Sequence, residues 1–484
     1  MSGGASIQGW TPKFRLPSSE TRPGVTISTF LQILGLIYCI AFTSFGVQSP
    51  GLIGSRGILP FPEYLDALRA AMGRAAWREA PSLLWFHPTD RALAAVWILG
   101  AVCSLLAIFA PYLSSAIPLR LRLSASQAQR LSLAGCLILW ISLCSVGQDF
   151  LSFQWDILLS EAGFLAIFAD ASRVRVWLFR WLLFRLMFFS GVLKLLSGDP
   201  TWRDLTALHY HYETQPLPNP VSWYIYQQPL WMAKAETLFT FVAELGVPFL
   251  YFGPRRARRV AAWITAALQF LILATGNFAF FNFLAIALCF WLTVEPERGP
   301  HPTPHKIVSV ALALFIGVSS ALVSLEQLTL PLPPGGAAIL HAIDPFRIVN
   351  GYGLFQVMTT DRPEILVEGS NGADHWQAYE FRYKPGDLRR APAVIEPAQP
   401  RLDWQMWFAA LGTYQTNRWF VSFMLRLLQG EPAVLRLVQY NPFPAAPPKY
   451  VRARLFLYHF TSWGGRDWWW REERGTYFPA VSLK

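Results

Sequence analysis

The sequence is poor in charged residues and in cysteine. Only 15% of its 484 residues are charged, whereas soluble globular domains carry about 25%. Its five cysteines, which all lie within apolar runs, give no sign of a disulfide framework or a Cys-x-x-Cys redox site; they are Cys39, Cys103, Cys136, Cys144 and Cys289. With 53% hydrophobic residues, this composition indicates a polytopic membrane protein.

Several motifs of catalysis and nucleotide binding are also absent. The chain has no Gly-x-Ser-x-Gly nucleophile elbow, no P-loop and no dinucleotide fingerprint after a strand. No set of ligand side chains has metal-site spacing, so we expect no metal and no cofactor. The net charge of +11 lies mostly in short loops between apolar runs. It therefore carries topology information and does not predict a nucleic-acid partner.

Nine apolar stretches are candidate membrane spans. They cover residues 27–47, 92–110, 131–147, 151–169, 181–197, 235–252, 260–276, 278–294 and 307–328. The third and fourth spans, and the seventh and eighth, are joined by tight turns, so either pair could be re-entrant. The sequence predicts a polytopic α-helical membrane bundle over residues 27–329. A cytoplasmic tail (1–26) precedes it, without a cleavable signal peptide, and outer loops lie at 48–91 and 198–234.

The loop charges predict the orientation. With the N-terminus in the cytoplasm, the outer loops are balanced or slightly acidic, and every inner loop obeys the positive-inside bias. The inner loops carry Arg120, Arg122, Arg130, Arg173, Arg175, Arg180, Arg255, Arg256, Arg258, Arg259, Arg298 and Lys306. Nine spans then place the C-terminus on the outer side.

A change of composition near Leu330 marks a second region. The linker 331–336 is rich in proline and glycine. The composition of residues 330–484 predicts a soluble β-rich or α+β domain. We expect it on the outer face of the membrane, in the lumen or the periplasm. We expect strands at 346–358, 365–368, 376–384 and 450–460, and helices at 404–411 and 419–428. Tryptophans at 463 and 468–470 suggest anchoring at an interface with the bilayer or the spans.

Two neighbouring spans carry full charges, which are costly in lipid unless paired or wetted. The fourth span holds Asp156 and Glu161, and the fifth holds Arg185 and Lys194. Antiparallel packing places Glu161 near the depth of Arg185, and Asp156 near that of Lys194. We predict these two ion pairs. They either only hold the bundle together, or Lys194 faces a water-filled outer pocket as an acid, base or ligand, with Asp156 or Glu161 setting its pKa.

The loop after the fifth span contains further polar candidates. His209, His211 and Glu213 alternate, so they share a face only in an extended segment. A metal site there lacks a complete ligand set, and polar residues bonded to the backbone are the alternative. Two further polar residues, Glu244 and Asn277, either complete the same pocket or satisfy helix ends. Candidate substrate-binding residues are Arg185, Arg203, His209, His211, Glu213, Glu244 and Asn277, and candidate catalytic residues are Lys194, Asp156 and Glu161.

Long stretches of the chain resemble the lipase maturation factor family. They include FLSFQWDILLSEAGFLA (150–166), WLLFRLMFFSGVLKL (181–195), TWRDLTALHYHYETQPLPNPVSWY (201–224), NGYGLFQVMTTDRPEILVEGS (350–370) and PPKYVRARLFLYHF (447–460). The resemblance implies a non-enzymatic, membrane-bound folding factor that helps secreted lipases assemble into active dimers. It implies a secreted lipase-like client, and location in the endoplasmic reticulum membrane of a eukaryote or the inner membrane of a bacterium.

A shorter segment is similar to part of the vitamin K-dependent gamma-carboxylase. It comprises Ser190–Leu195, with Trp202 shortly after. In that enzyme a lysine in this setting is the catalytic base for hydroquinone oxidation, and Lys194 matches its position. This resemblance leaves open a membrane enzyme with a lipid or quinone-like ligand. A transporter is less expected, because the chain shows no internal repeat.

Overall fold

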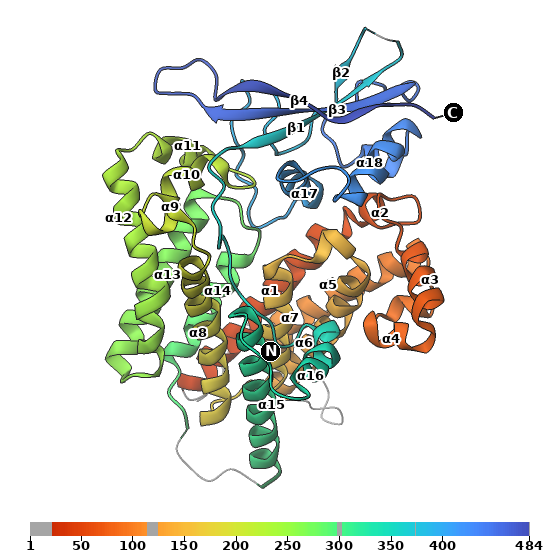
Figure 1. The fold of residues 1–484 in the computed structure, drawn as a ribbon. Helices are drawn as coiled ribbons and strands as arrows, with labels where there is room; N and C mark the ends of the chain where they lie inside the picture. The colour runs from red at the N-terminus through yellow and green to blue at the C-terminus, as the bar shows by residue number, and fades with distance from the viewer. Residues whose placement is uncertain (1–21, 114–123, 298–302, 373, 484) are drawn as a thin grey trace, which may run out of the picture.

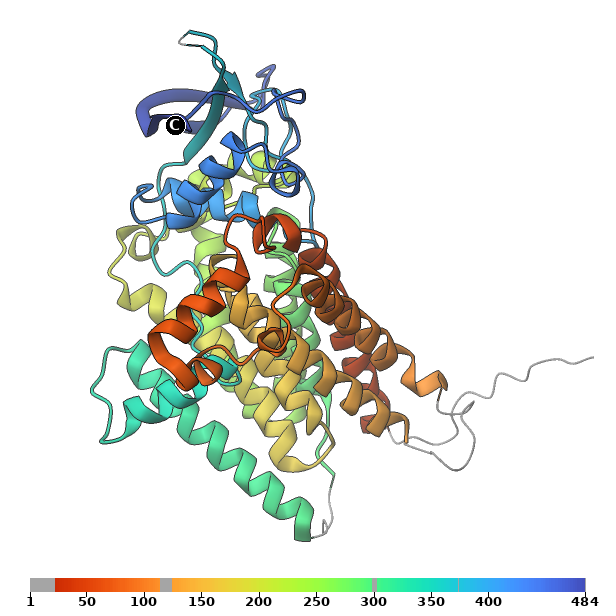
Figure 2. The same ribbon diagram turned by 90° about the vertical axis from the view of Figure 1, so that its right-hand side faces the viewer.

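The computed structural model describes residues 22–113, 124–297, 303–372 and 374–483. A helical bundle carries a four-stranded antiparallel sheet across one end (Figure 1). Helices α17 (Arg401–Ala410) and α18 (Arg418–Leu428) lie between the sheet and the bundle (Figure 2). The predicted class, a helical membrane bundle followed by an α+β region, is confirmed.

The first half of the described chain is helical. Its elements are α1 (Arg22–Gly46), α2 (Ser49–Leu52), α3 (Phe61–Met72), η1 (Gly73–Ala75), α4 (Ala76–Glu79), η2 (Leu83–Trp85), α5 (Asp90–Leu113), α6 (Ala125–Val146), η4 (Gln148–Leu151), α7 (Gln154–Ile167), α8 (Arg173–Leu196), α9 (Pro200–Arg203), α10 (Ala207–Thr214) and α11 (Pro220–Tyr226).

The second half completes the bundle and adds the sheet. Its remaining elements are α12 (Leu230–Phe241), the π-helical turn η5 (Val242–Gly246), η6 (Val247–Phe252), α13 (Arg255–Thr275), α14 (Phe281–Thr293), α15 (Thr303–Gln327), α16 (Gly336–Ile343), η7 (Asp344–Phe346), β1 (Pro363–Ser370), β2 (Gln377–Ala378), α19 (Pro432–Leu435), β3 (Tyr450–Phe460) and β4 (Trp469–Val481).

Seven helical segments of the described chain are long and apolar enough to cross a bilayer, instead of the nine predicted. The predicted fourth and eighth spans are the shorter helices α7, of 14 residues, and α14, of 13. At about 1.5 Å per residue, each is roughly 20 Å long, short of the hydrocarbon thickness of about 30 Å. Most of their residues are buried by neighbouring helices. Apolar composition alone could not separate a buried core helix from a full span.

The basic clusters lie at the end of the bundle away from the sheet. Arg180 donates to the carbonyl of Val294 at 2.7 Å, and Arg258 pairs with Glu295 at 2.5 Å. Arg175 pairs with Asp170 in the same region. Residues 1–21 of the predicted tail (1–26) lie outside the described residues, as do the basic residues Arg120, Arg122 and Arg298.

The C-terminal sheet has the order β2-β1-β3-β4. The predicted strand at 450–460 and both predicted helices are confirmed. Strand β1 includes the predicted 365–368, whereas the predicted strand at 376–384 reduces to β2 and an isolated bridge at Glu380. We did not predict β4, which pairs with β3 through several register shifts. Its charged run Arg471–Arg474 interrupts the hydrophobic alternation.

The predicted strand at 346–358 is wrong. Phe346 ends η7, and the other residues belong to an irregular segment, the connector (residues 347–362), which runs along the bundle up to β1 (Figure 1). Bundle side chains hold its backbone. Asp199 accepts a hydrogen bond from the Met358 amide at 2.5 Å, and Trp202 Nε1 donates to the Phe355 carbonyl at 3.0 Å. The alternating apolar residues of the connector therefore fill the bundle and do not pair in a sheet.

Candidate functional site

The predicted pair of Glu161 and Arg185 is present, and it fixes the connector. Both side chains are buried, and Arg185 Nη2 bonds Glu161 Oε1. Arg185 Nη1 also donates to the Asn350 carbonyl at 2.9 Å. Glu161 Oε2 accepts from the Asn350 amide at 3.0 Å and from the Tyr352 hydroxyl at 2.8 Å. Protein groups use both carboxylate oxygens, so this pair is a structural clamp.

The predicted pair of Asp156 and Lys194 is wrong. Asp156 instead receives a bidentate bond from Arg401 of α17, with N–O distances of 2.6 and 2.9 Å. Neither side chain is exposed. Arg401 also donates to the Phe150 carbonyl at 2.8 Å. This second clamp joins α17 to α7. Arg401 comes from the C-terminal region. Comparing the depths of residues in neighbouring spans could therefore not identify it as the partner of Asp156.

Lys194 pairs with Glu244, which lies on the π-helical turn η5. Its Nζ lies 2.6 and 2.7 Å from the two Glu244 carboxylate oxygens and 5.1 Å from the centre of the Trp202 ring. Gly191, one turn earlier on α8, allows this approach, because a Cβ there would lie 3.0 Å from the Glu244 Cβ. Single π turns inside helices often occur at functional sites. Of the two alternatives for Glu244, completion of the Lys194 pocket or satisfaction of a helix end, the structure places Glu244 in the wall of a cavity beside Lys194.

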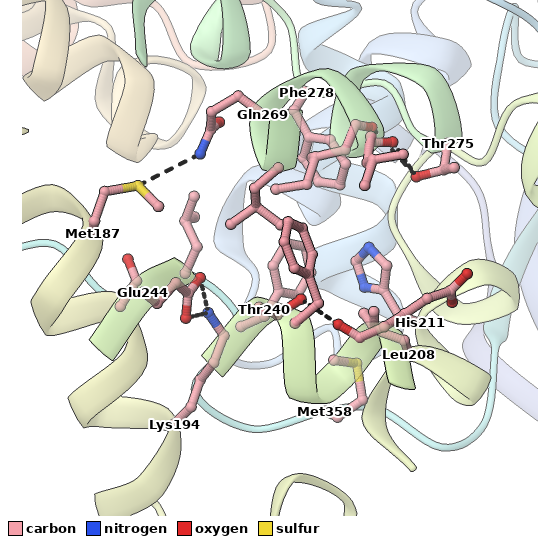
Figure 3. Close-up of a pocket in the computed structure, with 18 of the residues that line it drawn as sticks. Met187, Lys194, Leu208, His211, Thr240, Glu244, Gln269, Thr275, Phe278 and Met358 are labelled. Atoms are coloured by element: carbon pink, nitrogen blue, oxygen red, sulfur yellow. Dashed lines mark hydrogen bonds and ion pairs between the residues drawn. The ribbon is translucent and has the colours of Figure 1, made fainter. Parts of the chain in front are cut away.

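Lys194 and Glu244 line a cavity of about 140 Å³ (Figure 3). Its wall is mostly apolar and comes from α8 to α14, including the π-helical turn η5, and from the connector. The lining residues are Leu186, Met187, Ser190, Lys194, Trp202, Leu208, His211, Tyr212, Ile225, Glu236, Phe239, Thr240, Glu244, Leu268, Gln269, Leu271, Ile272, Thr275, Phe278, Phe281, Leu354, Phe355 and Met358. The charged pair can exchange a proton between an amine and a carboxylate at the edge of this space.

His209 and His211, both in the predicted outer loop, lie on different faces of their helix. Residues 207–214 form helix α10, so positions i and i+2 diverge by about 200°. His211 points into the cavity (Figure 3), whereas His209 stacks on Tyr226 with ring centres 5.6 Å apart. Burial, followed by the charge of Lys194, lowers the pKa of His211 to about 4. His211 is therefore a neutral imidazole at physiological pH.

Three other candidates lie outside the cavity wall. Glu213 accepts from the Phe460 amide at 2.6 Å, and burial raises its pKa to about 7. Asn277 joins the bundle to the C-terminal region, because it donates to the Ala393 carbonyl at 2.8 Å. Arg203 is exposed at the end of α9. Within the described residues, no group of three or more His, Cys, Asp or Glu side chains could hold a metal.

Several residues of the cavity wall escaped the sequence prediction. Gln269 is an isolated polar residue in the apolar helix α13 and is 3% exposed, a signal that could have been noticed. Phe355 and Met358 come from the connector. No sequence pattern placed these two residues, since they are more than 150 positions from Lys194 and their segment was expected to form a strand.

The fold and the site together define the class of protein to which this chain belongs. The chain is a multi-pass helical membrane protein with a C-terminal α+β region, which two buried arginine–carboxylate clamps and a connector fix to the bundle.

Comparisons with known proteins identify the family. The model of the lipase maturation factor transmembrane domain matches residues 25–297, and that of the lipase maturation factor C-terminal domain matches residues 348–479. Lipase maturation factor 2 of Gallus gallus is 36% identical over 94% of this chain and 81% of its own. The Homo sapiens protein of that name is 34% identical, over 94% and 82%.

Lipase maturation factor 1 of Bos taurus is also 34% identical, over 95% of this chain and 89% of its own. No solved structure matches. The chain belongs to the lipase maturation factor family.

Proposed function

We propose that the protein assists the maturation of a secreted, lipase-like client and contacts it through the sheet end of the molecule. The names of its relatives, the lipase maturation factors, supply the client class. In this proposal the sheet end faces the endoplasmic reticulum lumen of a eukaryote or the periplasm of a bacterium. The basic residues at the opposite end support this orientation, because positive loops stay in the cytoplasm.

Both predicted outer loops contact the C-terminal region. In the loop at 48–91, the Gly57 carbonyl accepts from Arg426 at 2.9 Å. In the loop at 198–234, the Glu213 and Pro216 carbonyls accept from the buried Arg362 at 2.7 and 2.9 Å. The loops and the sheet therefore offer one continuous surface to a client.

An exposed aromatic patch on this surface carries the client proposal. The patch consists of Tyr224, Trp463 and the half-buried Trp468 and joins α11 to the β3–β4 hairpin. Tyr224 is 50% exposed and Trp463 65% exposed, and their ring centres lie 5.6 Å apart. Clusters of exposed aromatic residues are typical of protein-binding surfaces. A partly folded client with unburied apolar segments fits this patch.

The test is a complementation assay in cells that lack their own lipase maturation factor. The double variant Tyr224→Ala/Trp463→Ala should reduce the activity of a co-expressed secreted lipase at least about fivefold, because aromatic hot spots contribute more than 1 kcal/mol each. Trp263→Ala on α13 is the matched control, since this tryptophan is 79% exposed but lies on a membrane-span helix. Unchanged lipase activity at equal protein level would reject the patch as a client site.

The second candidate function is enzymatic, with a lipid or quinone-like substrate and Lys194 as the base. The observation that favours it is the position of Lys194 at the edge of the cavity with a carboxylate that can accept its proton. The paired variants Lys194→Ala and Lys194→Arg should both abolish function in the complementation assay at normal protein level. If both retain function, Lys194 performs no chemistry and the enzymatic candidate fails.

A further inference from the structure

The cavity beside Lys194 contains two buried polar atoms for which the described residues provide no hydrogen-bond partner. They are His211 Nδ1 and Gln269 Oε1. His211 is 9% exposed and Gln269 is 3% exposed. The Gln269 amide nitrogen contacts the Met187 sulfur at 3.6 Å, which is a weak acceptor. Buried polar groups normally have partners, so these atoms indicate a missing hydrogen-bonding group in the cavity.

The two atoms come from different elements and face the same space. His211 extends from α10 and Gln269 from α13, with Lys194 and Glu244 on a third side (Figure 3). The Gln269 carbonyl oxygen is an acceptor, and Nδ1 of a neutral imidazole accepts when the other nitrogen carries the proton. A ligand that satisfies the Gln269 oxygen must therefore donate a hydrogen bond, as a hydroxyl group does, and a hydroxyl can pair with His211 Nδ1 in either tautomer.

The size and wall of the cavity indicate the body of the ligand. Its volume of about 140 Å³ is close to that of apolar protein cavities of about 150 Å³ that bind benzene. Phe278, Phe281 and Phe355 lie in its wall. Aromatic walls favour a planar ring through edge-to-face and stacked contacts. The space therefore suits one six-membered ring, and a longer tail would have to leave through an opening between helices.

The charge balance excludes an anionic head group. Both carboxylate oxygens of Glu244 lie within 2.7 Å of Lys194 Nζ, so the ammonium is already neutralised. His211 carries no charge at neutral pH. A carboxylate or phosphate in the cavity would be an unpaired buried charge, which is costly.

We propose that this cavity binds a neutral phenol-class molecule, with its ring between the phenylalanines and its hydroxyl donating to Gln269 Oε1. The proposal deepens the second candidate function by naming the ligand class of the same site. It requires no reaction at Lys194 and no client, so direct binding can fail or succeed separately from either proposed function.

The test is equilibrium binding of 4-fluorophenol to the purified full-length protein in detergent, measured by ¹⁹F NMR. Fluorobenzene and 4-fluorobenzoate are the comparison probes. We expect saturable binding of 4-fluorophenol, about threefold to tenfold tighter than fluorobenzene because of one additional hydrogen bond. Fluorobenzoate should bind about a hundredfold more weakly because its charge stays unpaired.

Two variants assign the binding to this cavity. Ser190→Leu adds apolar bulk to the wall and should abolish saturable binding, whereas Ser126→Leu makes the same change at an exposed position of α6 and should not. Gln269→Leu preserves the volume and should remove the preference for 4-fluorophenol over fluorobenzene, even if Ser190→Leu does not fold.

Three results would overturn the proposal: no saturable binding, binding of fluorobenzoate as tight as that of 4-fluorophenol, or an unchanged phenol preference in Gln269→Leu.

Discussion

The ion pairs of Arg185 and Lys194, two residues of helix α8, differ in what surrounds them. Both carboxylate oxygens of Glu161 accept from protein groups, and the Glu161–Arg185 pair holds the Asn350 and Tyr352 region of the connector, although Arg185 Nε has no partner among the described residues. Lys194, nine residues further along the same helix, pairs with Glu244 and faces a cavity. A buried charge in a membrane helix can therefore be part of a clamp or part of a site, and a cavity beside the charged groups distinguishes the two.

The largest predicted effect is at the clamp. Arg185→Met leaves the Glu161 carboxylate buried without its cation, and we expect a loss of about 3–5 kcal/mol in the free energy of unfolding. Thermal unfolding of the purified protein and the folded yield from cells measure this loss. Arg203→Met is the matched control, because this arginine is exposed and its loss should cost less than about 0.5 kcal/mol. Equal stability of the two variants would show that the clamp does not hold the fold.

The next effect is a pH dependence at the cavity. Since burial lowers the pKa of His211 from 6.5 to about 4, its stabilising contribution is complete above pH 6.5 and is lost as the pH falls toward 4. The shift corresponds to about 3 kcal/mol. His211→Asn should reduce the decline in unfolding temperature between pH 6.5 and 4. If the unfolding temperatures of the parent protein and of His211→Asn changed identically with pH, His211 would be hydrated and would titrate normally.

Glu213, which lies on the same helix as His211, should give stability the opposite dependence on pH. Its pKa is raised from 4.5 to about 7, so its protonated form favours folding and stability falls as the pH rises from 4.5 to 7. Glu213→Gln should therefore reduce the decline in stability between pH 4.5 and 7, and the change in the free energy of unfolding should be below about 3 kcal/mol. Unfolding temperatures measured across pH 4.5–7 test it, and a steeper decline in the variant would contradict the assignment.

The smallest expected loss of stability is at the Lys194–Glu244 pair. Lys194→Met should cost only about 1–2 kcal/mol, because Glu244 can take up a proton and become a neutral acid beside the cavity. Thermal unfolding of this variant beside Arg185→Met tests the ranking. An equal or larger loss for Lys194→Met would mean that Lys194 is also a clamp residue.

Local patterns predicted the elements of the fold well. The alternation in residues 450–460 gave β3, and the relative depth of two antiparallel neighbours gave the Glu161–Arg185 pair. Both depend on residues that are close in sequence. The span count was too high because α7 and α14 are apolar and buried by protein.

Long-range packing decided the parts that the sequence analysis missed. Arg401 pairs with Asp156 from 245 positions away, and Glu244 pairs with Lys194 from 50 positions away. Nothing in the local pattern of either segment selects its partner. The sequence analysis considered a pocket at Lys194 but missed part of its wall, because the connector supplies Phe355 and Met358 only after the whole chain has folded.

A high-resolution density map of the full-length protein would test the distinction between clamp and site most directly. The account predicts non-protein density, from water or a ligand, within hydrogen-bond distance of His211 Nδ1 or Gln269 Oε1, and none beside Glu161 or Asp156. Solvent density beside the Glu161 carboxylate, or a collapsed cavity with His211 bonded to protein, would contradict it.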